Sequence, residues 1–186
     1  MKKILVAGVL ALVSNYTLAA EGGYISGDFG VGIPTADDIS IGASTISFDP
    51  GFAFNAAVGN EFANNFRAEI EIGYQQNNMT ASNSLGNSAA IRMSTITVLA
   101  NGYYAFNNDS NFVPFIGGGI GYGALTNELT LATHAFAYQF GGGLDYFVTD
   151  KFSVGAKYMF RGLVNNYDFV DNPESNNIYA GAKFYF

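Results

Sequence analysis

Charged side chains recur at every second position in several segments of the sequence, and ion pairing is the chemistry that they offer. In "FRAEIEIGY", residues 66–74, a base and two acids alternate with apolar residues, and "FSVGAKYMFR", residues 152–161, repeats the pattern. An unpaired charge held away from water is costly. Four acids and four bases on one face therefore predict an interior polar network. Its members are Asp28, Arg67, Glu69, Glu71, Asp145, Lys157, Arg161 and Lys183.

The other candidate chemistries find little support. The sequence has no cysteine, which excludes a disulfide framework, a thiolate metal site and a cysteine nucleophile. His134 is the single histidine and has no obvious catalytic or ligand partners. The glycines of "GGGIGYG", residues 117–123, do not match a phosphate-binding motif. Four of them fall at period two, which predicts room for long interior side chains. We expect no enzyme, catalytic residue, cofactor or metal.

Composition points to a membrane-embedded sheet. Charged residues make up 12% of the chain, against a typical ~25%, and aromatic residues 16%. Acidic residues outnumber basic ones by fifteen to eight, which disfavours nucleic acid as a partner. Beyond the N-terminus no apolar run is long enough for a membrane-spanning helix. Within lipid the alternative to helices is a closed barrel, which pairs every backbone group.

The first twenty residues are predicted to be a Sec-type secretory signal peptide. Lys2 and Lys3 precede the ten-residue apolar run 4–13, which is too short to span a bilayer as a helix. Small residues then allow cleavage after Ala19 or Ala20. The predicted organisation is therefore a signal over 1–20 and one barrel domain over 21–186.

Alternation of period two predicts eight strands, because successive side chains of a strand point to opposite faces. Each segment is about as long as a tilted membrane strand requires, roughly 9–11 residues. The predicted strands are 23–33, 51–60, 66–76, 91–106, 112–124, 135–147, 152–161 and 176–186. Three connections are short and polar, at 61–65, 107–111 and 148–151; four are long, at 34–50, 77–90, 125–134 and 162–176. The fold class is therefore all-β: an antiparallel, up-and-down transmembrane barrel with short periplasmic turns and four long extracellular loops.

Three details of this arrangement can be tested by a structure. In the segment 91–106 the alternation points Leu99 inward and Arg92 outward, so Arg92 must lie above the hydrocarbon or a bulge must shift the register. The first and last strands are neighbours in a closed barrel, which suggests Asp28 and Lys183 as partners. Asp145 and Lys157 flank the last short turn and are also candidates for pairing.

The C-terminal segment "IYAGAKFYF" ends on a phenylalanine with apolar residues at alternate positions before it. This pattern resembles the signal that the outer-membrane assembly machinery recognises. The residues that match it are Ile178, Ala180, Ala182, Phe184 and Phe186.

Residues 21–186 resemble the eight-stranded OmpA-like outer-membrane barrels, in particular the porin-like branch with opacity proteins and surface antigens. The resemblance rests on "GFAFNAAVGNEF", "NNFRAEIEIGY", "NGYYAF", "VPFIGGGIGYG", "YQFGGGLDYFVTD" and the C-terminal segment. It implies an outer-membrane location in a Gram-negative-type bacterium and a surface-exposed structural or interaction role as an antigen or adhesin. The alternatives are a small-solute porin and, more remotely, a lipid-modifying enzyme. A soluble lipocalin-like barrel would reverse the two faces and leave too few charges outside.

The resemblance and the strand count also suggest partners. We expect membrane lipid and lipopolysaccharide around a monomeric barrel, the assembly machinery during biogenesis, and an unidentified extracellular ligand at the loops. Eight strands leave a lumen just wide enough for side chains, so the interior charges are expected to form a plug, with a gate as the alternative. The loop carboxylates form either a solvated rim or a site for divalent cations. They are Asp37, Asp38, Asp49, Glu128, Asp168, Asp171 and Glu174.

Overall fold

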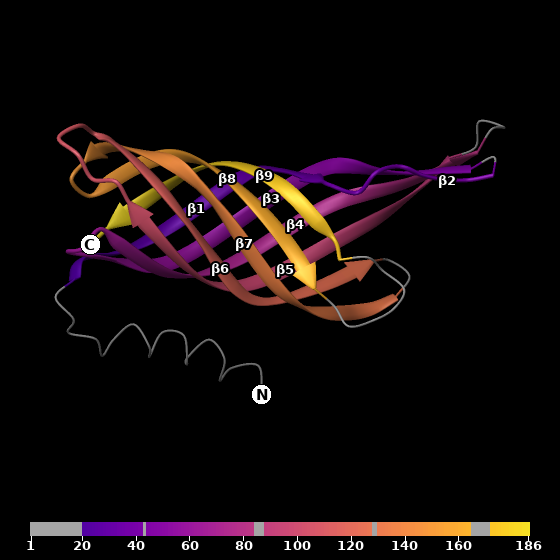
Figure 1. The fold of residues 1–186 in the computed structure, drawn as a ribbon, viewed down its shortest axis with the longest axis horizontal. Helices are drawn as coiled ribbons and strands as arrows, with labels where there is room; N and C mark the ends of the chain where they lie inside the picture. The colour runs from indigo at the N-terminus through magenta and orange to yellow at the C-terminus, as the bar shows by residue number, and fades with distance from the viewer. Residues whose placement is uncertain (1–19, 43, 84–87, 128–129, 165–171) are drawn as a thin grey trace.

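The computed structural model describes residues 20–42, 44–83, 88–127, 130–164 and 172–186. These residues form nine strands (Figure 1). Their bounds are β1 (Ala20–Pro34), β2 (Ile39–Ile41), β3 (Ser44–Phe62), β4 (Phe66–Asn83), β5 (Ser88–Ala105), β6 (Phe112–Asn127), β7 (Thr130–Thr149), β8 (Phe152–Val164) and β9 (Glu174–Tyr185). Apart from Ala20, the predicted signal segment lies outside the described residues.

Eight of these strands close into an antiparallel barrel, which confirms the predicted fold. Neighbours along the chain pair from β3 to β9, and β1 pairs with both β9 and β3. Closure leaves the barrel wall without a free edge. The ninth element, β2, is a short addition that pairs with β3 outside the barrel.

The outer surface of the barrel is apolar, as period-two alternation predicts. Ile72, Ile120 and Ile178 are 55%, 60% and 56% exposed, values that a water-soluble surface would rarely show for so many large apolar side chains. Aromatic side chains cluster near the ends of the strands; the Phe112 and Tyr146 rings, for example, lie 4.8 Å apart. An apolar band flanked by aromatic residues is typical of a membrane barrel. Among the described residues there is no helix long and apolar enough to cross a bilayer.

Three tight connections define one end of the barrel, here called the turn end. They fall between β3 and β4, β5 and β6, and β7 and β8, close to the predicted short turns. Asn65 has a φ of 67° and donates its backbone N–H to the Phe62 carbonyl at 3.0 Å. Asparagine adopts this left-handed conformation more readily than most residues, because its side chain bonds locally.

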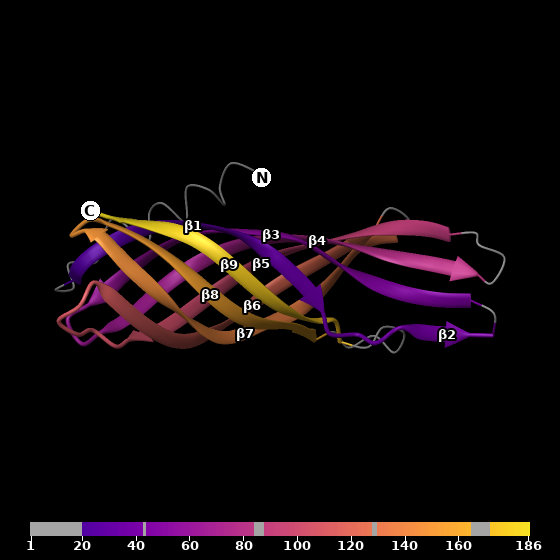
Figure 2. The same ribbon diagram turned by 90° about the horizontal axis from the view of Figure 1, so that it is seen from above.

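The opposite end, here called the loop end, differs from the prediction. Three of the four predicted long loops, 34–50, 77–90 and 125–134, are largely strand, because β3 to β7 continue beyond the barrel. The upper parts of β3, β4 and β5, with β2, form a sheet that projects far past the other strands (Figure 2). This sheet is rich in Ser, Thr and Asn, a composition typical of loops. Outside lipid, however, strands can pair through their backbones without alternating apolar side chains. Of the fourth loop, residues 165–171 lie outside the described residues.

A bulge marks where the barrel ends and this sheet extension begins. The β3–β4 register shifts between Asp49 and Phe52. Below the shift, odd-numbered residues of β3 such as Ala53 and Asn55 are buried inside. Above it, the even-numbered Phe48 turns to the inner side and lines a cavity. An inserted residue reverses the alternation, so a single phase could not describe this strand.

Strand β5, by contrast, keeps one register along its whole length. Leu99 is fully buried in the lumen, as predicted. Arg92 is exposed and lies opposite Asn78 in the sheet extension, beyond the last pair that joins β5 to β6. Strand β5 therefore needs no bulge, and its register places Arg92 beyond the closed wall of the barrel.

The inward glycines of β6 give space to neighbouring side chains. A Cβ atom added to Gly119 would lie 1.9 Å from the Asn101 amide oxygen and 2.6 Å from the Ala100 carbonyl oxygen. The predicted packing role of these glycines is confirmed, and Asn101 can extend into the lumen because Gly119 has no side chain.

Candidate functional site

The lumen is filled by charged and polar side chains, and the charged residues predicted from the sequence come from five strands. Alternation in β4 sends Arg67, Glu69 and Glu71 inward, while β7 contributes Asp145 and β8 contributes Arg161; all five are at most 7% exposed. Three further members, Asp28, Lys157 and Lys183, are half-buried on β1, β8 and β9. All eight residues of the predicted network thus lie on the inner face.

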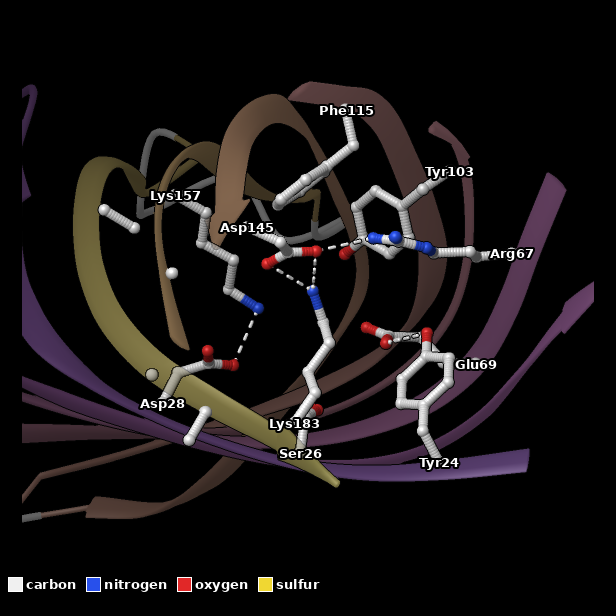
Figure 3. A pocket seen from close by; sticks show the side chains of 14 residues that line it. Tyr24, Ser26, Asp28, Arg67, Glu69, Tyr103, Phe115, Asp145, Lys157 and Lys183 are labelled. Atoms are coloured by element: carbon white, nitrogen blue, oxygen red, sulfur yellow. Dashed lines mark hydrogen bonds and ion pairs between the residues drawn. The ribbon is translucent and has the colours of Figure 1, made fainter. Parts of the chain in front are cut away.

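Asp145 is the centre of a cluster near the turn end (Figure 3). Its carboxylate accepts a bond of 2.6 Å from Arg67 Nη1 and bonds of 2.6 and 2.8 Å from Lys183 Nζ. Arg67 also donates from Nε to Glu61 at 2.8 Å. The Lys183 ammonium lies 4.7 Å from the centre of the Phe115 ring, a cation–π contact. The Asp145 cluster therefore joins β3, β4, β7 and β9 across the lumen.

Glu71 is the centre of a second cluster, further from the turn end. It is fully buried and accepts bonds of 2.9 Å from Arg161 Nη2 and 3.2 Å from Lys157 Nζ. Lys157 also reaches Asp28 Oδ2 at 2.8 Å. The Gln139 amide bonds both Glu71 and Arg161. The Glu71 cluster links β1, β4, β7 and β8, so both clusters connect strands that are not neighbours.

Glu69 departs from the expectation that every interior acid pairs with a base. Its carboxylate accepts a bond from the Tyr24 hydroxyl at 2.8 Å and one from the Asn101 amide at 3.1 Å. Within the described residues no base lies at ion-pair distance from Glu69. Neutral donors therefore hold this carboxylate between the two clusters.

Two pairings suggested by the sequence are wrong. The partner of Asp28 is Lys157 and not Lys183. The partner of Asp145 is Lys183 and not Lys157. The reason is register: Asp28 lies opposite Gly181, while Lys183 lies opposite Ser26 and Ser153 and extends across the lumen. Asp28 and Lys183 are therefore on adjacent strands but not directly opposite one another.

Glu61 is a further acid of the network that was not predicted. Glu61 bonds Arg67 and accepts a bond from the Tyr185 hydroxyl at 3.3 Å. The predicted turn 61–65 includes Glu61, whereas strand β3 continues to Phe62. Its odd number, in phase with the buried Asn55, was the signal that could have identified it.

Apolar side chains share the lumen with these charges. One buried cluster contains Leu99, Ala135, Ala137 and Leu163. Another contains Ala53, Tyr103, Phe115, Met159 and Tyr179. The lumen is therefore closed by apolar packing as well as by ion pairs.

Little free volume remains around the charged clusters. The cavity between Asp28, Arg67, Glu69, Asp145 and Lys183 is about 20 Å³, close to the space of one water molecule. By contrast, a vestibule of about 580 Å³ opens at the loop end. Phe48, Met93, Leu125 and Leu163 lie in its wall. The geometry supports a lumen that is filled in its middle and widens toward the loop end.

The remaining candidate residues lie apart from the two charged clusters, although Asp37 and Glu174 line the vestibule. His134 is exposed and stacks on the Tyr122 ring, with centres 5.4 Å apart. Asp49 accepts a bond from Thr80 and Glu174 one from Tyr138. The described residues bring no three His, Cys, Asp or Glu side chains into a metal-binding group. Of the other loop carboxylates, Glu128, Asp168 and Asp171 lie outside the described residues.

The C-terminal residues of the predicted assembly signal face outward. Ile178, Phe184 and Phe186 are 56%, 49% and 63% exposed, and Ala180 and Ala182 share their face. Phe186 donates its backbone N–H to the Gly23 carbonyl at 3.0 Å, which joins the end of the chain to β1.

Comparison with known proteins agrees with this geometry. The outer membrane protein PagN of Salmonella typhimurium is 26% identical over 157 residues, which cover 76% of this chain and 62% of PagN. The crystal structure of Neisserial surface protein A superposes with a TM-score of 0.63 at 18% identity and covers 91% of this chain and all of that one. OprG from Pseudomonas aeruginosa gives 0.56 at 15% identity, covering 90% and 97%.

The chain spans less than two thirds of the length of PagN, and the two structural likenesses concern the fold alone. Family membership rests on a broader match, which includes nearly the whole sequence. Residues 4–186 match the model of the family described as "Outer membrane protein beta-barrel domain". With its closed, lipid-facing barrel, this chain belongs to that family and is a protein of the outer membrane.

Proposed function

We propose that this protein is a surface-exposed structural or interaction barrel whose lumen is plugged. The observation that carries the proposal is the contrast between a cavity of about 20 Å³ among the interior charges and a large sheet extension at the loop end. The loop end faces outside the cell in this proposal, as in other outer-membrane barrels. The sheet extension therefore lies at the end of the barrel that can contact partners.

The ion pairs support a structural plug rather than a solute path. Four acids and four bases form six ion pairs, five of them between strands that are not neighbours, and two apolar clusters fill much of the remaining lumen. Opening a path would separate Glu71 from both Arg161 and Lys157 at once. Separating buried charges without a replacement partner is strongly unfavourable.

The proposal includes the surroundings of the barrel. The apolar outer band is suited to membrane lipid, and lipopolysaccharide would surround the sheet extension. The outward phenylalanines at the C-terminus support recognition by the assembly machinery, and a closed wall without free edges is consistent with a monomer. No catalytic role is proposed, since His134 stacks on a tyrosine at the protein surface.

The small-solute porin remains the second candidate, and one observation favours it: the vestibule of about 580 Å³ enters the barrel from the loop end. In this alternative the vestibule would be the entrance to a path that opens when the Glu71 cluster rearranges.

Adhesion of intact cells tests the interaction role directly. Cells that display the wild-type protein should bind more strongly to host-cell or bacterial surfaces than cells that display a version with residues 78–92 replaced by a tight turn. The replacement leaves the barrel strands in place, and folding is verified by the different migration of boiled and unboiled protein on a gel. Equal adhesion of both folded proteins to every surface tried would contradict the proposal.

A further inference from the structure

The sheet extension has two chemically different faces. Residues directly opposite one another in antiparallel strands lie on the same face. One face carries the rows Ile46–Ala81–Ala89 and Phe48–Met79–Ile91. The other carries the rows Thr45–Ser82–Ser88, Ser47–Thr80–Ala90 and Asp49–Asn78–Arg92. The extension is therefore amphipathic, although it projects beyond the barrel.

The apolar face continues the inner wall of the barrel. Phe48 and Met93 both line the vestibule, which identifies this face as the inner one. Ala81 and Ala89 are exposed, and Phe48, Met79 and Ile91 are half-buried. Within the described residues no strand packs across this face, whereas inside the barrel the opposite wall fills the same position.

The apolar rows end at a free strand edge. Pairing between β5 and β6 begins at Met93 and Asn127, so residues 88–92 pair only with β4 in the described part of the chain. Their backbone groups on the other side are available for a further strand. Edge strands are usually protected by Lys, Pro or a bulge. This edge, "SAAIR", has no Lys, no Pro and no register shift, and Arg92 is its one charged residue.

We propose that the edge of β5 and the apolar inner face together form a docking site for an extended polypeptide segment of a partner, which adds to the sheet as a strand beside residues 88–92. An added strand would pair the free backbone groups and prolong both apolar rows in one step. An acyl chain would cover the face but leave the backbone groups without hydrogen bonds. This inference rests on the proposed interaction role and specifies its site and partner class.

The chemistry of the site defines the segment. Beside Ala89 and Ile91 it should carry apolar side chains at alternate positions, with small polar side chains between them. Asp37, Asp38, Asp49 and Glu174 are described acids at the loop end, where Arg92 is an exposed base and Arg161 is buried in the Glu71 cluster. A neutral or basic segment therefore suits the site better than an acidic one.

A synthetic peptide provides a direct probe. The peptide has nine alternating Val and Thr residues with a Lys at each end, and the folded barrel is held in phospholipid nanodiscs. Binding of the peptide should slow amide hydrogen exchange at residues 88–92, while amides of β8 should exchange as before. Unchanged exchange at 88–92 in the presence of excess peptide would overturn the proposal, and this measurement requires no variant.

Two variants on the same edge separate the faces. Ile91→Lys places a charge on the apolar row, whereas Ala90→Lys places the same charge on the polar face. Because the loss of one buried aliphatic contact is equivalent to about a tenfold change in affinity, Ile91→Lys should weaken peptide binding by at least about tenfold. Ala90→Lys should change it less than about threefold. An equal loss in both variants would overturn the proposal.

Other occupants would be recognised by different results. If a fatty acid binds the wild type but not Ile91→Lys, and amide hydrogen exchange at residues 88–92 is unchanged, the face binds acyl chains and the proposal is wrong. If barrels pair in a concentration-dependent way and Ile91→Lys abolishes this, a second copy is the occupant and the proposal is again wrong. Adhesion that survives in Ile91→Lys cells while the peptide fails to bind would reject this site and leave the proposed interaction role standing.

Discussion

Strands β3, β4 and β5 cross two regions with the same backbone pairing but different surroundings. Below the bulge at residues 49–52, their inward side chains face five other strands, and Glu71 is fully buried between two bases. Above it, the inward side chains Phe48, Met79 and Ile91 have no opposite wall within the described residues. The lower region is packed like a protein core, whereas the upper region has an uncovered apolar surface that a partner could contact.

The comparison shows how one sheet serves two purposes. Inside the barrel each inward residue affects stability, because a change leaves a buried partner without its bond. In the extension the same kind of change alters a surface and should barely affect stability. Matched substitutions in the two regions can therefore confirm or break the distinction.

The largest difference is expected for removal of a carboxylate. Glu71→Ala leaves Arg161 and Lys157 without their shared acid and should lower the free energy of unfolding by about 3 kcal/mol. Asp49→Ala removes an acid that bonds only the Thr80 hydroxyl in the described residues, and should cost less than about 1 kcal/mol. Urea unfolding in lipid vesicles, followed by circular dichroism because the chain has no Trp, measures both. Equal costs would remove the distinction between the regions.

A smaller effect is expected from added volume in the lumen. Gly119→Ala places a methyl group against Asn101 and the β5 backbone, and should destabilise the barrel by about 2 kcal/mol. Gly27→Ala is the matched control, because a Cβ atom at Gly27 meets nothing within 4 Å. The same unfolding measurement applies. If Gly119→Ala were as stable as Gly27→Ala, the lumen would be less tightly packed than the structure indicates.

The smallest effect separates the two kinds of interior acid. Glu69→Gln retains an oxygen acceptor for the neutral donors Tyr24 and Asn101 and should cost about 1 kcal/mol or less. Glu71→Gln removes a charge that two bases share and should cost clearly more. A reversed order would show that Glu69, rather than Glu71, organises the plug.

Much of the barrel could be predicted because alternation depends on local sequence alone. The eight strands, the inward Leu99 and the inner position of the eight charges follow from period two and closure. The partner of each charge could not be predicted, because it depends on strand register and on how far a lysine extends across the lumen. Lys183, with serines on either side in register, bonds Asp145 on a strand that is not its neighbour.

The sheet extension was missed for a different reason. Its residues, such as Ser47, Thr80 and Ser82, are typical of loops, and the bulge near Asp49 reverses the alternation that identified the strand below. The apolar rows become visible only when β3, β4 and β5 are placed in register. Sequence alone therefore describes the region in contact with lipid better than the region that projects beyond it.

Electrical recording tests the central claim, a closed lumen beneath an open loop end, most directly. Purified wild-type barrel, shown to be folded by its gel migration, is inserted into planar bilayers and recorded under an applied voltage. A lumen with about 20 Å³ of free space among its charges should show no stable, porin-sized conductance. A steady large conductance from the folded wild-type protein would contradict the plug and favour the small-solute porin.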